Sequence, residues 1–225
     1  MYMPERSVQF GTYNSITDFD LVMGDITIGS PEPQTVTVDI PFRDGTLDET
    51  EYFGAVHYSN RELNIPFYIP YGKDYQAVYT NFMNRIHGQK FQIWLSNDTE
   101  WFYEGRVSVG DLELSDVDGW WGFDVTCDCE PYRYYLFEKT VSTSTTATSV
   151  TITVGRKYVC PYFSWDNSSI SYITVTDPNG NSYAIYKDVG YDPSLIIGAP
   201  DTTTIKIATP TGSTNVTITY KRGKF

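Results

Sequence analysis

Alternation of apolar and polar residues is the feature that most constrains the fold of this chain. From Leu63 to Ile69 every second residue is large and apolar, and the same period returns at 91–95 and 123–129. Because successive side chains of a strand point to opposite faces, this period indicates strands with one buried face. Pro66 interrupts the first run and cannot donate a ladder hydrogen bond, so we expect an edge strand or a bulge there.

One segment, at about residues 74–87, has helical spacing. Asp74 is suited to the N-cap position and Gly88 to the C-terminal stop. The expected apolar face contains Tyr75, Val78, Tyr79, Phe82 and Ile86. The expected fold class is therefore mainly β: an N-terminal β-sandwich with one α-helix, followed by a C-terminal β-sandwich.

Charge is distributed unevenly along the 225 residues. Residues 1–139 hold nine basic and 23 acidic residues, a net charge of −14, whereas residues 140–225 hold seven basic and five acidic residues, a net charge of +2. A Ser/Thr-rich stretch begins at Thr140, and short strands separated by turn residues follow it. We therefore predict two domains, 1–139 and 140–225, joined by a short linker at the start of the second.

The segment 36–54 stands apart from the other strand patterns. Val36, Val38 and Ile40 form an alternating strand, Pro41 ends it, and a dense acidic run follows the Asp44-Gly45 turn. Closely spaced acids repel one another, so the run is either a solvated loop or part of a contact with a partner that pairs with its charges. The subunit-interface candidates are Arg43, Asp44, Leu47, Asp48, Tyr52 and Phe53.

The same segment carries a family resemblance. The run DIPFRDGTLDETEYFG (39–54), with Tyr58-Ser59-Asn60-Arg61 and the strand after it, resembles the N-terminal domain of siphophage distal tail proteins, the Dit family. Gly105-Arg106-Val107 and the position of the helix match the family layout. The resemblance covers about the first 135 residues; beyond them only the layout agrees, with a galectin-like or carbohydrate-binding-like sandwich.

The resemblance implies a structural virion protein at the phage tail tip, made in the cytoplasm of the host bacterium. Its N-terminal domains would form a homohexameric ring hub with a channel for DNA ejection. Implied partners are the tail tube protein, the tail-associated hub protein, and receptor-binding or baseplate proteins. The rival interpretation is a carbohydrate-binding module or adhesin that acts through the C-terminal sandwich.

Other function classes find little support in the residues. We expect no catalytic, metal or cofactor site: His57 and His87 are isolated, and no common nucleophile, phosphate or metal motif occurs. Glu100 and Glu104 could form a glycosidase pair, the basis of a weaker cell-wall hydrolase hypothesis. An acidic domain without a basic patch is not expected to bind nucleic acid, and no apolar run has membrane-spanning length.

Aromatic residues of the second domain leave a carbohydrate partner open. Tyrosine and tryptophan rings can stack on sugar rings, but small sandwiches also bury them or use them in protein contacts. The glycan-contact candidates are Tyr158, Tyr162, Trp165, Tyr183 and Tyr186.

Overall fold

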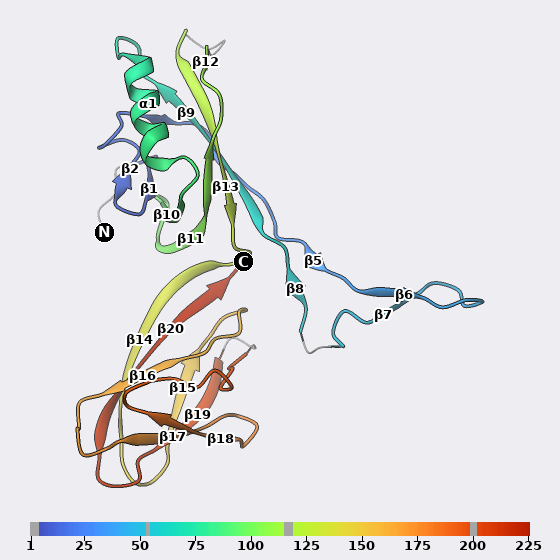
Figure 1. The fold of residues 1–225 in the computed structure, drawn as a ribbon, viewed down its shortest axis with the longest axis vertical. Coiled ribbons are helices and arrows are strands. Elements are labelled where there is room, and N and C mark those ends of the chain that lie inside the picture. Colours follow the sequence, from blue (N-terminus) through green and yellow to red (C-terminus); the bar gives the residue numbers. More distant parts are fainter. Residues whose placement is uncertain (1–4, 53–54, 115–118, 199–201) are drawn as a thin grey trace. The chain divides into compact units, whose positions relative to one another are not determined.

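The computed structural model describes residues 5–52, 55–114, 119–198 and 202–225 (Figure 1). By its contacts the chain divides into two compact units. Unit 1 takes the described residues up to Arg133 together with Phe225, and unit 2 takes those from Tyr134 to Lys224. Each unit has its own cluster of buried apolar side chains. No helix in the described part of the chain has the length and hydropathy that a membrane span requires.

Unit 1 is built on a curled antiparallel sheet with the order β2-β1-β10-β11-β13-β9. Beyond that row, β9 also pairs with β3 and β4, and β13 pairs with β12. The strands are β1 (Val8–Phe10), β2 (Tyr13–Asn14), β3 (Val22–Met23), β4 (Thr27–Ile28), β9 (Arg61–Ile69), β10 (Lys90–Leu95), β11 (Asp98–Val109), β12 (Glu113–Leu114) and β13 (Trp121–Cys129).

The helix α1 (Tyr75–Ile86) covers the core of this sheet, as predicted. The Asp74 side chain accepts a hydrogen bond from the Ala77 amide at 3.1 Å, which caps the first turn. Phe82 is fully buried, and its ring centroid lies 4.9 Å from that of Phe19 and 5.4 Å from that of Phe123. These contacts fix the helix by packing, because twelve residues alone form only a marginal helix.

Pro66 does not lie on an edge strand, but it does face the irregularity that was the other expectation: the three residues 24–26 lie opposite the two residues 65–66. β9 pairs with β13 along its whole length and with β3 and β4 on its other side. The Pro66 carbonyl accepts from the Gly24 amide at 2.8 Å, so the proline nitrogen also faces that side, where the chain passes from β3 to β4. The ladder is already interrupted there, and a missing N–H costs little.

Between β4 and β9 the chain forms a long hairpin of two successive two-stranded ladders (Figure 1). β5 (Pro33–Gln34) pairs with β8 (His57–Tyr58), and β6 (Thr37–Asp39) pairs with β7 (Thr46–Asp48). The register places Val38 opposite Leu47. We call residues 33–52 of this segment the long hairpin.

Unit 2 is a two-sheet sandwich. One sheet has the order β15-β19-β17-β18, and β16, β20 and β14 lie side by side in the other. Large buried residues such as Phe163 and Ile218 from one sheet and Ile173 and Ile207 from the other share one core. The strands are β14 (Arg133–Thr143), β15 (Thr148–Thr153), β16 (Tyr162–Trp165), β17 (Tyr172–Thr176), β18 (Ser182–Tyr186), β19 (Thr202–Ala208) and β20 (Thr214–Lys224).

The expected linker at the start of the second domain is instead part of this sandwich. Residues 140–143 end strand β14, and the buried Thr143 hydroxyl donates to the Ile207 carbonyl at 2.8 Å. The Ser/Thr-rich composition misled the prediction because serine and threonine also suit the solvent face of a strand. The division between the units accordingly falls at 133/134, six residues before the predicted boundary.

Candidate interaction surfaces

The long hairpin exposes a row of apolar side chains. Val36, Val38 and Ile40 are 53%, 42% and 38% exposed, and Phe42 is fully exposed with a positive φ of 65°. A two-stranded ladder has no second layer of its own to cover such a row. The sequence analysis did not include these residues among the interface candidates, because alternation predicts an apolar face without showing what covers it.

The predicted interface residues lie on the same hairpin. Arg43 and Asp44 are exposed at its tip, where Gly45 has a φ of +74°. Leu47 is half-buried, while Asp48 and Tyr52 are exposed. Phe53 lies outside the described residues. The hairpin therefore combines the predicted acidic run with an apolar row whose exposure the sequence did not reveal.

Asp48 and Thr50 hold the base of the β6–β7 ladder. The Thr50 amide donates to Asp48 Oδ1 at 3.0 Å, and Thr50 Oγ1 accepts from the Val36 amide at 3.0 Å. The hydrogen bonds from the Thr50 side chain and amide lower the pKa of Asp48, because they favour the charged carboxylate. Asp48 is thus a structural residue of the hairpin as well as an interface candidate.

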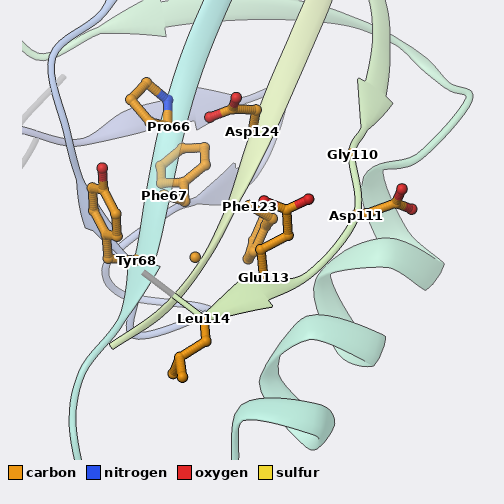
Figure 2. Close-up of a pocket in the computed structure, with 10 residues that line it drawn as sticks. Pro66, Phe67, Tyr68, Gly110, Asp111, Glu113, Leu114, Phe123 and Asp124 are labelled. Atoms are coloured by element: carbon orange, nitrogen blue, oxygen red, sulfur yellow. The ribbon is translucent and has the colours of Figure 1, made fainter. Parts of the chain in front are cut away.

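A shallow groove of about 430 Å³ lies beside β9, β12 and β13 (Figure 2). Its lining includes the acidic residues Asp111, Glu113 and Asp124 beside Tyr68 and Leu114. Across the described parts of the chain, no three His, Cys, Asp or Glu side chains are grouped so as to hold a metal ion. The groove therefore contributes negative surface to unit 1 without forming a metal centre.

Two of the four residues weighed for catalysis have structural partners. His87 Nδ1 accepts from the Val109 amide at 3.0 Å. Lys90 Nζ lies 2.9 Å from Glu104 and 3.1 Å from Glu130, so Glu104 is part of an ion pair. Glu100 and His57 are exposed on their strands.

The five aromatic candidates of unit 2 do not form one surface. Trp165 is only 5% exposed and its indole N–H donates to the Ile170 carbonyl at 2.9 Å, so its ring belongs to the core and has no open face for a sugar. Tyr183 packs partly against the core, and its hydroxyl bonds to Asp177 at 3.3 Å. Tyr186 is exposed on β18. Tyr162 is exposed on β16, which belongs to the opposite sheet, and Tyr158 is exposed just before that strand.

Comparison with solved structures shows a likeness of fold. No family model and no curated protein sequence matches the chain. The crystal structure of the Dit protein (gp 19.1) of SPP1 is similar to this fold, with a TM-score of 0.66 over 96% of this chain and 98% of that chain, at 14% sequence identity. That protein is described as a paradigm of the hub adsorption apparatus in Gram-positive infecting phages.

At this low identity, the likeness to SPP1 Dit establishes the fold alone. It extends over nearly the full length of both chains, so it includes unit 2 as well as the part that carries the sequence motifs. The expected fold class is confirmed: the chain is mainly β, with one helix among the described residues.

Proposed function

We propose that this chain is a structural protein of a phage tail tip, a distal tail protein that forms the ring hub between tail tube and baseplate. The observation that carries the proposal is the likeness to SPP1 Dit across 96% of this chain. It agrees with the independent resemblance of residues 39–61 to the same family. Two arguments, one from sequence motifs and one from the fold, thus favour the same kind of protein.

Under this proposal the long hairpin supplies one of two unlike contact patches. A closed ring of identical subunits needs head-to-tail contacts, in which one patch meets a different patch on the neighbour. Val36, Val38 and Ile40 offer apolar anchors, and large exposed apolar areas mark interaction sites on soluble proteins. Arg43, Asp44 and Asp48 would form its charged rim, where ion pairs set register more than affinity.

The acidic character of the first 139 residues suits a ring through which DNA passes. A wall rich in lysine and arginine would hold the duplex by releasing counterions, whereas an acidic or neutral wall lets it slide. Repulsion is screened within about 10 Å at ordinary salt, so only charges close to the lumen act. The proposed partners are other copies of the chain, the tail tube and tail-associated hub proteins, and baseplate or receptor-binding proteins.

A non-enzymatic role follows from the same proposal and agrees with the ion pair at Glu104. The proposed location is the virion, at the tail tip, after synthesis in the cytoplasm of the bacterial host.

Negative-stain electron microscopy with light scattering tests the assembly directly. Six copies of the 25.6 kDa chain give a mass of about 154 kDa. Particles of that mass with a central hole are expected in the purified protein. A monomer of 25.6 kDa at every concentration, with no ring in the micrographs, would overturn the hub proposal.

A second candidate function is carbohydrate binding through unit 2. The observation that favours it is the exposure of Tyr158 and Tyr162 in one stretch of chain. This function is compatible with a hub, since a tail-tip protein can also contact the cell surface.

A further inference from the structure

Among the described residues of unit 1, one buried cation has no anion bonded to it. Arg61 begins β9, is only 6% exposed, and its Nε atom has no hydrogen-bond partner in the described part of the chain. None of the described carboxylates forms an ion pair with it. A buried charge without a partner is costly, so an unsatisfied guanidinium group in a folded protein calls for an explanation.

Three strands place the guanidinium group. Arg61 lies opposite Cys129 of β13, which in turn lies opposite Gly105 of β11, so the three residues form one row across the sheet. Gly105 contributes no side chain to the row. The guanidinium carbon of Arg61 lies 5.7 Å from the centre of the Tyr103 ring, on the same face of β11. This cation–π contact steadies the charge but supplies no oxygen for its N–H groups.

Neighbouring acids do not supply that oxygen either. Burial raises the pKa of Cys129 to about 12, the charge of Asp128 adds to the rise, and the charge of Arg61 opposes it. Each acid whose charge acts on Cys129 or Tyr103 has a partner of its own. The pairs are Asp128 with Asn60 at 2.9 Å, Glu130 with Lys90 at 3.1 Å, and Asp98 with Arg133 at 2.7 Å. These acids moderate the charge of Arg61 from a distance, but their oxygens are bonded elsewhere.

We propose that Arg61 is a binding site for one small oxyanion, a carboxylate group. The planar fork of an arginine binds both oxygens of a carboxylate through two parallel N–H bonds, and in Arg61 the Nε–H is available for such a bond. The low exposure of Arg61 admits only a small group. A water molecule could accept one N–H bond, but it would leave the buried charge unbalanced.

The carboxylate can come from two sources. One is a small free anion. The other is an acidic side chain of a second copy of the chain, such as Asp44 or Glu51 of the long hairpin, which are exposed and have no bonded partner among the described residues. The first source is independent of the hub proposal, because a monomer can bind a free anion, whereas the second rests on it.

Thermal unfolding of the full-length protein tests the free anion, with sodium formate as the probe and sodium chloride keeping the ionic strength constant. Formate at ten times its Kd should favour the folded state about elevenfold and raise Tm by a few degrees. Arg61→Met should abolish this rise, because methionine has no N–H group. Without formate this variant should be at least as stable as wild type, since an uncompensated buried charge is removed.

Light scattering over a dilution series tests the second source. If the carboxylate belongs to a neighbouring copy, Arg61→Met should raise the Kd between subunits at least about tenfold and keep its Tm. Asp44→Asn or Glu51→Gln, whichever removes the acid that reaches Arg61, should have the same effect.

Arg85→Met is the matched control, because the Arg85 guanidinium lies 5.6 Å from the centre of the Tyr13 ring but is exposed. It should leave the formate response and the assembly as in wild type. Arg61→Lys keeps the charge without the planar fork and should weaken formate binding at least about tenfold, so it carries the test if Arg61→Met does not fold.

The proposal is overturned if the Tm of the wild type does not respond to formate and the assembly of Arg61→Met matches that of the wild type. Water alone would then solvate the guanidinium group. A wild type that forms no ring counts against the hub, and a formate response of that monomer, lost in Arg61→Met, would still support the site.

Discussion

Replacing Val36, Val38 and Ile40 together by threonine should dissociate the proposed ring and leave the subunit folded. Threonine keeps the β-branched shape that favours strands, so the ladder between β6 and β7 should persist. The three side chains are already exposed in the single chain, and surface substitutions usually change the free energy of unfolding by less than about 0.5 kcal/mol. The change therefore acts mainly on the contact between subunits.

The expected magnitude follows from the exposed fractions of 53%, 42% and 38%. Full burial in a subunit contact would remove from water the equivalent of about 1.3 exposed side chains. Burying one hydroxyl without a partner costs about 1–3 kcal/mol. Scaled by the equivalent of about 1.3 side chains, the free energy of each subunit contact should become less favourable by roughly 1–4 kcal/mol. This corresponds to a rise in Kd of roughly 5- to 700-fold at each contact.

Light scattering over a dilution series measures the effect, with thermal unfolding as the check on the subunit. Val22→Thr is the control, because Val22 has the same 42% exposure as Val38 but lies on β3, outside the long hairpin. The triple variant should dissociate at concentrations where wild type and control remain assembled. If it keeps the wild-type mass throughout, the apolar row is not a subunit contact. A large fall in Tm would instead mean that the row stabilises the subunit itself.

Four further predictions concern the two units separately. At pH 8 a maleimide should label only Cys160 in the folded chain, because Cys127 and Cys129 are buried and burial raises the pKa of Cys129 to about 12. Above about pH 9 the unfolded chain loses the Cys129 proton first, so Tm should fall as the pH rises from about 9 towards 12. A fragment of residues 134–224 should unfold cooperatively when followed by circular dichroism. A fragment of residues 140–225 lacks Tyr134 and Phe137, so its free energy of unfolding should be lower by at least about 3 kcal/mol. Equal stability of the two fragments would place the domain boundary at residue 140. Asp74→Ala should lower the free energy of unfolding by about 1 kcal/mol and Tm by a few degrees, because it removes the helix cap. Asn caps a helix as well as Asp does, so Asp74→Asn should leave Tm unchanged. Equal losses in the two variants would show that capping is not the cause.

Features that depend only on neighbouring residues could be predicted from the sequence. Alternation at 63–69 and 123–129 identified β9 and β13 and their buried faces, since side-chain period follows directly from strand geometry. Asp74 and Gly88 identified the ends of α1, because caps act within one turn of the helix. The acidic run at 43–52 identified the hairpin as unusual, because like charges close together need an explanation in any fold.

Whether an apolar face is covered by other elements of the fold is visible only in the three-dimensional structure. The row Val36, Val38 and Ile40 has the same period as the buried face of β9, yet it is exposed, because alternation records a face but not what covers it. Trp165 and Tyr162 lie three residues apart, and only the packing of the two sheets distinguishes the buried ring from the exposed one. The rings of Tyr158 and Tyr162 pack against Gly198 and Gly190, which lie 40 and 28 positions away in the chain. Contacts of that separation are set by the pairing of strands, which no local pattern of residues encodes.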